Sequence, residues 1–233
     1  MNQSYSVSKG KVEILNAFMR GVYQWMAIGL GLTGIIAYYT ASSPKLLSII
    51  FGNPMVMWGL IIAEFGLVIG ISAGISKLSA GMATGLFLLY SALNGLTLSA
   101  IFLVYTASSI ASTFLVCAGM FGAMSIYGLA TKKDLTSWGS FLFMGLIGIV
   151  IASLVNIFLK SSGLSFVISG IGVLVFVGLT AYDTQKLKEM GLSAPYEDRV
   201  AIQRGTILGA LTLYLDFINL FLMLLRFMGQ SRD

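Results

Sequence analysis

Three acidic side chains of this 233-residue chain lie inside long apolar stretches, where an ionised carboxylate is costly. They are Glu64, Asp183 and Asp216. A charged group at the centre of a membrane helix costs about 2.5–3.5 kcal/mol on insertion scales, so such a residue faces a partner or a hydrated cavity. Because carboxylates in that setting can bind protons or hard cations, we take these three residues as candidate site residues.

Asp216 is the strongest candidate because other polar residues share its side of a helix. Thr212 precedes it by four positions and Asn219 follows it by three, which places the three side chains on one helical face. Asp183 lies near the end of the preceding apolar stretch, and one hairpin joins the two stretches. We therefore expect Asp183 and Asp216 to meet. The structural alternative is a protonated Asp216 that serves packing alone.

Two carboxylates in one poorly hydrated site cannot both ionise cheaply, so the pair titrates as a unit. The same oxygens suit calcium, which prefers roughly 6–8 oxygen ligands, whereas two carboxylates supply about four at most. We therefore expect a weak calcium site at Asp183 and Asp216, at which protons and the cation compete.

Three polar residues of the apolar stretches are the expected lining of a pathway or gate: Glu64, Asn94 and Asn219. Asn94 and Asn156 are the candidate hydrogen-bond partners of Glu64. A neutral Glu64 that bonds a hydroxyl or an amide for packing is the structural alternative.

The elements that must position these residues are membrane-spanning helices. The chain is 57% hydrophobic and 10% charged, against about 25% charged in a soluble domain, which excludes a soluble globular protein. The apolar stretches are continuous over the ~20 residues that a membrane helix needs, and they do not alternate as barrel strands do. The predicted spans cover residues 22–41, 54–76, 82–105, 109–131, 137–159, 164–185 and 205–227.

This pattern predicts a single domain embedded in the lipid bilayer. Residues 1–21 form an N-terminal tail, residues 22–229 the seven-helix domain and residues 230–233 a short C-terminal tail. Ten Lys and Arg residues fall on the side of the N-terminus and four on the other side, which predicts a cytoplasmic N-terminus and an extracytoplasmic C-terminus. The net charge of +5 lies at helix ends facing lipid head groups, so we expect no nucleic-acid partner. Residues 186–204 form the one sizeable loop.

Histidine is absent and Cys117 is the single cysteine, which excludes a histidine triad, a Cys/His zinc site and an intrachain disulfide. No cofactor is expected. Aspartates on two consecutive helices are also found in intramembrane aspartyl proteases of the presenilin type. Those enzymes need Gly-x-Gly-Asp on the second helix, whereas Asp216 follows Leu-Tyr-Leu, so we expect a protein that is not an enzyme.

Two segments carry a resemblance to a known family: residues 181–186 (Ala-Tyr-Asp-Thr-Gln-Lys) and residues 211–221 (Leu-Thr-Leu-Tyr-Leu-Asp-Phe-Ile-Asn-Leu-Phe). With residues 224–226, 23–26 and 132–135 they resemble the Bax inhibitor-1 family, and the likeness runs over nearly the whole chain. It is strongest toward members from the bacterial inner membrane.

The resemblance implies an all-α integral membrane protein in which two three-helix layers wrap a central last helix. It also implies a pH-sensitive calcium leak gated by an aspartate pair, which falls on Asp183 and Asp216. Glu64 takes the place of the family's membrane glutamate. Some members latch the aspartates with an arginine at the end of the second span, where this chain offers only Lys77.

Two other functions stay open at this point. Bacterial members are tied to a membrane protease of the quality-control type, so the protein could be a non-conducting adaptor or modulator of such a protease. A proton-coupled cation exchanger would use the same acidic pair. Flux that follows the calcium gradient alone distinguishes the leak from the exchanger, and absence of flux favours the adaptor.

Overall fold

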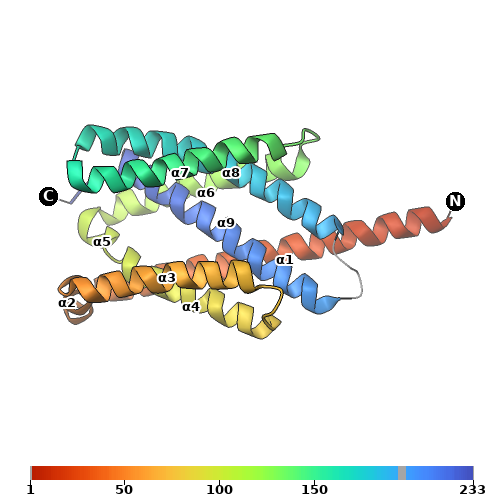
Figure 1. Ribbon diagram of the computed structural model, residues 1–233, viewed down its shortest axis with the longest axis horizontal. Helices are drawn as coiled ribbons and strands as arrows, with labels where there is room; N and C mark the ends of the chain where they lie inside the picture. Colours follow the sequence, from red (N-terminus) through yellow and green to blue (C-terminus); the bar gives the residue numbers. More distant parts are fainter. Residues whose placement is uncertain (1, 194–197, 233) are drawn as a thin grey trace. The chain divides into compact units, whose positions relative to one another are not determined.

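The computed structural model describes residues 2–193 and 198–232, with side chains from residue 11 onward. Its regular elements are all helices, drawn in chain order in Figure 1: α1 (Asn2–Ala41), α2 (Pro44–Phe51), α3 (Pro54–Gly74), α4 (Ala80–Leu98), α5 (Ile101–Val104), α6 (Ala107–Ala130), α7 (Thr136–Leu159), α8 (Ser162–Ser193) and α9 (Arg199–Met228). An isolated antiparallel bridge joins Tyr105 to Ser231. The predicted all-α class is confirmed.

Among the described residues, six helices are long and apolar enough to cross a membrane: α3, α4 extended through α5, α6, α7, α8 and α9. Helices α1 and α2 meet the same criteria as a pair bent by 100°, which brings the number to seven. The protein is therefore an all-α integral membrane protein, and the seven predicted spans agree with the structure when the bent pair counts as one.

Polar caps and prolines set several of the helix starts. Asn53 accepts a hydrogen bond from the backbone N–H of Met55, and Pro54 occupies the first turn of α3. Ser43 and Pro44 do the same for α2, a short helix in a stretch that the hydropathy pattern treats as a loop. A capping side chain followed by proline is a strong helix start, because proline has no N–H to leave unsatisfied there.

Several helices extend beyond the apolar stretches that predicted them. Helix α1 starts at Asn2 rather than near residue 22, α8 continues to Ser193, and α9 starts at Arg199. The expectation of a sizeable loop over residues 186–204 is therefore wrong, although residues 194–197 lie outside the described chain. Hydropathy marks the part of a helix that lies in lipid, and good helix formers such as Lys186, Lys188 and Glu189 carry the helix further.

The chain forms two compact units. Unit 1 comprises Met1–Val104 and Leu187–Tyr214, and unit 2 comprises Tyr105–Lys186 and Leu215–Asp233. In unit 1, α4 packs against both α1 and α3. The last helix is the most enclosed of the candidate spans: 72% of its apolar window is buried, against 6% for α3.

Glycines allow close helix contacts in both units. In unit 1, a Cβ on Gly95 of α4 would lie 2.8 Å from the carbonyl oxygen of Thr33 on α1. In unit 2, a Cβ on Gly128 of α6 would lie 2.4 Å from the carbonyl oxygen of Ala181 on α8. Both distances are below van der Waals contact, so these backbones approach as only glycine permits.

Candidate functional site: a carboxyl pair in unit 2

Asp183 on α8 and Asp216 on α9 are hydrogen-bonded to each other through their carboxyl groups. An ionised carboxylate has no donor, so this bond requires a proton on one of the two residues. Asp216 is 6% exposed, whereas Asp183 is half-buried. The two residues expected to meet are therefore in contact.

Two buried oxygens, one on Asp216 and one on the residue that follows Asp183, have no hydrogen-bond partner within the described part of the chain. They are Oδ2 of Asp216 and the hydroxyl Oγ1 of Thr184, both buried. A buried acceptor without a partner costs about 1–3 kcal/mol. Oδ2 of Asp216 and the Asp183 carboxyl group are hard-oxygen donors of the kind that suits a cation or water.

A positively charged side chain, Lys186, lies near the pair on α8, the helix that carries Asp183. Lys186 lies three positions after Asp183 and interacts with it electrostatically. The Lys186 ammonium is 6.0 Å from the centre of the Tyr182 ring, so its aliphatic stem follows the surface of α8. Lys186 is exposed, and its electrostatic partner in the pair is Asp183, not the buried Asp216.

Gln185 fixes α8 at the carboxyl pair. Its Oε1 accepts a hydrogen bond of 2.8 Å from the backbone N–H of Leu135, and its Nε2 donates one of 2.8 Å to the carbonyl oxygen of Lys133. The side chain is 8% exposed. Gln185 thus joins α8 to the connection between α6 and α7, two residues from Asp183. The sequence analysis missed this role, because a glutamine bonded to backbone leaves no pattern in a single sequence.

Glu64 lies in unit 1, on α3, and its partner differs from the expected asparagines. The Thr97 hydroxyl on α4 lies 3.0 Å from Glu64 Oε1 and 3.0 Å from the Asn94 carbonyl oxygen, and its proton is available to either acceptor. Asn94, one turn earlier, donates to the Tyr90 hydroxyl at 3.2 Å instead. The expected Glu64–Asn94 hydrogen bond is therefore wrong, because the rotation of α4 turns Thr97 toward α3.

Asn156 also has another role. In unit 2 it ends α7, where its Nδ2 donates to the Ser165 hydroxyl at 2.6 Å and its Oδ1 accepts from the backbone N–H of Ser161 at 3.0 Å. The side chain joins the end of α7 to the start of α8. It is a structural cap, and the expectation that it pairs with Glu64 is wrong.

An aromatic and hydroxyl cluster adjoins Glu64 in unit 1. The rings of Tyr90 and Tyr214 meet edge to face at 5.6 Å, and Glu64 interacts electrostatically with both. The Tyr214 and Thr33 hydroxyls are 2.6 Å apart, and Thr33 donates to the Ser91 carbonyl at 2.8 Å. Since Thr33 uses its proton for Ser91, Tyr214 is the donor to Thr33.

The last two predicted site residues are Asn219 and Lys77. Asn219 donates to the carbonyl oxygen of Leu215 on its own helix at 2.8 Å. Lys77 is exposed in the turn after α3. An arginine reaches the same turn from another helix: Arg204 of α9 donates to the Ser76 carbonyl at 2.9 Å. The sequence analysis sought an arginine within this stretch and so missed one that the fold brings there.

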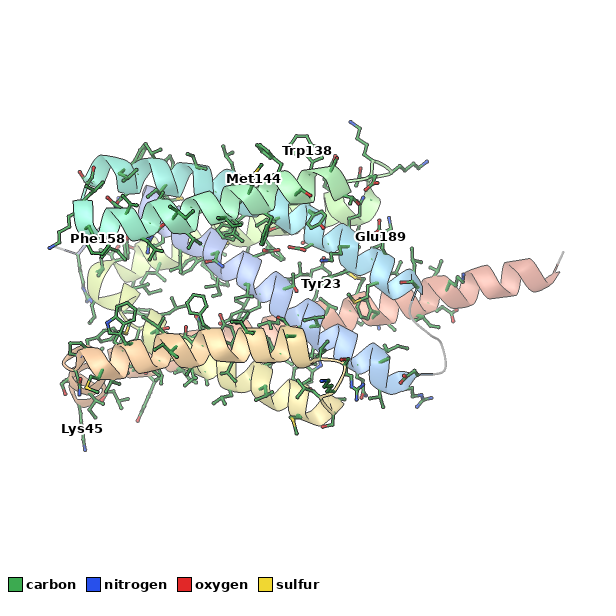
Figure 2. All side chains as sticks on the ribbon, viewed as in Figure 1. Tyr23, Lys45, Trp138, Met144, Phe158 and Glu189 are labelled. Atoms are coloured by element: carbon green, nitrogen blue, oxygen red, sulfur yellow. The ribbon has the colours of Figure 1, made fainter. Side chains whose placement is uncertain are left out.

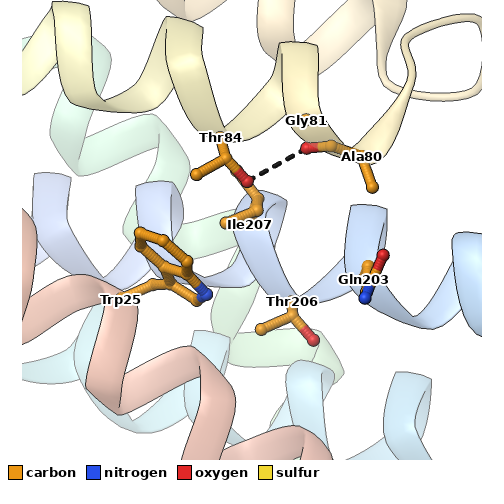
Figure 3. A pocket seen from close by; sticks show the side chains of 7 residues that line it. All are labelled: Trp25, Ala80, Gly81, Thr84, Gln203, Thr206 and Ile207. Atoms are coloured by element: carbon orange, nitrogen blue, oxygen red, sulfur yellow. Dashed lines mark hydrogen bonds between the residues drawn. The ribbon is translucent and has the colours of Figure 1, made fainter.

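Within the residues described, no cluster of three or more His, Cys, Asp or Glu side chains could hold a metal ion. The carboxyl pair thus has two acidic side chains and no third one beside it among the described residues. A cavity of about 270 Å³ in unit 1 is an alternative place for a ligand. Figure 3 shows its lining, in which Thr84 donates to the carbonyl of Ala80 and Trp25 and Thr206 complete the walls. None of its seven lining residues is ionisable, so it offers no carboxylate to a cation.

Comparison with known proteins gives the family. The family model described as "Inhibitor of apoptosis-promoting Bax1" matches residues 15–233. The chain is similar to "Inner membrane protein YbhL" of Escherichia coli (strain K12), with 61% identity over 218 residues, 94% of this chain and 93% of the relative. An uncharacterized protein of Borreliella burgdorferi is 50% identical over 225 residues, 97% of each chain, and one of Rickettsia prowazekii is 48% identical over 232 residues, 98% of this chain and 96% of the relative. The chain belongs to the Bax inhibitor-1 family.

Proposed function

We propose that the protein is a pH-sensitive calcium leak of the membrane, and that Asp183 and Asp216 are both its gate and its pH sensor. One observation carries the proposal: the hydrogen bond between these two carboxyl groups, which needs a proton and joins α8 to α9. The pair also offers oxygen ligands of the kind that calcium prefers.

The shared proton accounts for the pH dependence. Two unit charges about 4 Å apart repel by about 4 kcal/mol at an effective dielectric constant of about 20, so loss of the proton leaves an unfavourable pair of anions. The anions then separate or bind a cation between them. Acid therefore closes the leak by restoring the hydrogen bond, and a rise in pH opens it.

The other polar residues receive subsidiary roles in this proposal. Glu64, Asn94 and Asn219 line the pathway or gate, and the link between Glu64 and Thr97 supports a polar position for Glu64. Lys77 is the proposed latch, and its exposed place in the turn after α3 leaves its ammonium able to move. A lysine latch is weaker than an arginine latch because it has no bidentate fork.

We place the protein in the bacterial cytoplasmic membrane, with the N-terminus in the cytoplasm and the C-terminus outside. The name of the Escherichia coli relative supports the membrane, and the excess of Lys and Arg on one side supports the orientation. Alkaline phosphatase fused to the C-terminus should be active in cells, and green fluorescent protein fused there should not fluoresce. The reverse result would overturn the orientation.

Calcium flux into liposomes tests the leak. Wild-type protein reconstituted with a calcium gradient should conduct more at higher pH, whereas Asp183→Asn and Asp216→Asn should lose that dependence. Glu189→Gln is the matched control, because Glu189 is an exposed acid on the same helix as Asp183. Equal flux in all four proteins would overturn the gate.

The same assay separates the other functions. Calcium uptake driven by a pH gradient, with calcium equal on both sides, would identify a proton-coupled exchanger. Absence of flux at every pH would favour an adaptor of a membrane protease. The proposal assigns no catalysis, so cleavage of a membrane peptide that Asp216→Asn abolishes would contradict it.

A further inference from the structure

We propose that a cavity in unit 2 binds a phospholipid whose head group carries both a phosphate and a primary ammonium, as phosphatidylethanolamine does. The cavity measures about 320 Å³ and lies between α6, the α6–α7 connection, α7 and α8. Ligand sites measure about 300–1,000 Å³, so it has room for a head group rather than a whole lipid. The inference is independent of the proposed ion leak.

The polar end of the cavity is formed by two neighbouring residues of opposite charge, Lys133 and Asp134. Lys133 matches a phosphate and Asp134 matches an ammonium. Hydrogen bonds from the side chain and backbone of Thr136 lower the pKa of Asp134, so it stays ionised over a wide pH range. A purely anionic head group would meet the Asp134 carboxylate, which disfavours it.

The walls of the cavity are apolar and aromatic. Met124, Leu142 and Ala181 supply apolar surface, and Tyr127, Trp138 and Tyr182 supply rings. The α6–α7 connection joins two candidate spans and so lies where the membrane meets water. Tyrosine and tryptophan with nearby lysine are the composition typical of that depth.

Acyl chains have a path away from the cavity. A hollow of about 290 Å³ lined by Ser137, Trp138 and Phe141 shares Trp138 with the cavity. Trp138 is 60% exposed and Phe141 64% exposed, so this face of α7 offers apolar surface to lipid. Figure 2 shows Trp138 and Phe158 at opposite ends of α7, along which the chains would run.

The site is held in shape by protein contacts. Buried Gln185 bonds the backbone of Lys133 and of Leu135, on either side of Asp134. Gly139 lets the Tyr182 ring approach α7, because a Cβ there would lie 2.4 Å from two ring carbons. The two charged residues and one aromatic wall are therefore positioned before a ligand binds, which lowers the cost of binding.

Native mass spectrometry of the full-length protein tests the site. The protein is released from detergent in the presence of equal amounts of phosphatidylethanolamine, phosphatidylcholine and phosphatidylglycerol. We expect phosphatidylethanolamine to be retained most. Lys133→Ala and Asp134→Asn should each reduce its retention about fivefold, because each removes one of the two charges that match the head group. The asparagine keeps the oxygen that bonds Thr136.

Two further variants complete the test. Lys132→Ala is the matched control, because Lys132 is an exposed neighbour that does not line the cavity, and its lipid retention should stay unchanged. Leu142→Trp fills the cavity and should abolish retention, provided that the variant keeps the elution volume of the wild type. Retention of phosphatidylethanolamine that Lys133→Ala, Asp134→Asn and Leu142→Trp all leave unchanged would overturn the site. Stronger retention of phosphatidylglycerol or phosphatidylcholine would overturn the assignment of the head group.

Discussion

Gln185 accepts a hydrogen bond of 2.8 Å from the backbone N–H of Leu135, so a buried side chain of α8 holds the residue that precedes α7. Because the same amide donates to the Lys133 carbonyl, the connection between α6 and α7 is attached to α8 at two points. Asp183 lies two positions before Gln185 on the same helix. A substitution that breaks these two hydrogen bonds should therefore also make the position of the carboxyl pair less fixed.

Replacement of Gln185 by alanine should destabilise the protein by about 1–3 kcal/mol, because it leaves the buried N–H of Leu135 and the carbonyl of Lys133 without their partner. Thermal unfolding in detergent, followed by circular dichroism, measures the effect. Gln185→Glu keeps an acceptor for Leu135 but sets a carboxylate against the Lys133 carbonyl oxygen, so it should also destabilise the protein. Equal stability of the alanine variant and the wild type would show that the attachment contributes nothing.

Asp216→Asn should abolish the pH dependence of calcium flux and leave the flux low. The asparagine amide can donate to Asp183 at every pH, so the hydrogen bond between α8 and α9 no longer depends on a proton. In the wild type the bond is present at low pH and lost as the pH rises. Flux at a series of pH values checks this, and a variant that still opened with rising pH would contradict the shared proton.

Thr97→Val should destabilise unit 1 by about 1–3 kcal/mol, because it removes the hydroxyl that lies 3.0 Å from Glu64 Oε1 and keeps the shape of the side chain. Thr97→Ser retains the hydroxyl and serves as the matched control. Thermal unfolding of the two variants measures the difference. If the valine variant were as stable as the serine variant, Glu64 would not depend on this hydrogen bond.

Gly128→Ala should cost about 1–3 kcal/mol, because the added methyl group meets the Ala181 carbonyl and forces α6 away from α8. Gly122→Ala, on the same helix, is the control: a Cβ there meets nothing within 4 Å. Alanine also favours helix over glycine, so the control should be neutral or slightly stabilising. Equal melting temperatures of the two variants would contradict the close contact.

Part of the site could be predicted because its determinants are local in sequence. Asp183 and Asp216 stand on consecutive helices joined by a short connection, so their meeting follows from the hairpin. The partner of Glu64 depends on how far α4 is rotated against α3, and one turn separates Asn94 from Thr97. Gln185 bonds backbone atoms some 50 positions away, and a backbone atom has no sequence signature.

Helix boundaries, too, could be predicted from the sequence only in part. Ser43 and Pro44 form a helix start that propensity rules predict, but the eight-residue helix is too short for a pattern that searches for spans of about 20 residues. The extension of α8 to Ser193 carries charged side chains, so hydropathy ends before the helix does. Apolar length predicts how much of a helix lipid can cover, and capping and propensity decide where the helix ends.

The bend of 100° between α1 and α2 limits how deeply the first helix can be immersed. Helix α2 has eight residues, about 12 Å at roughly 1.5 Å per residue, which is too short to reach the far side of a bilayer. We expect this short helix, which lies crosswise at the end of α1 with Lys45 near its start, to rest among the lipid head groups. An interfacial helix at this position keeps α1 from moving along the membrane normal and sets the depth of Thr33 and its neighbours on α1 in the bilayer.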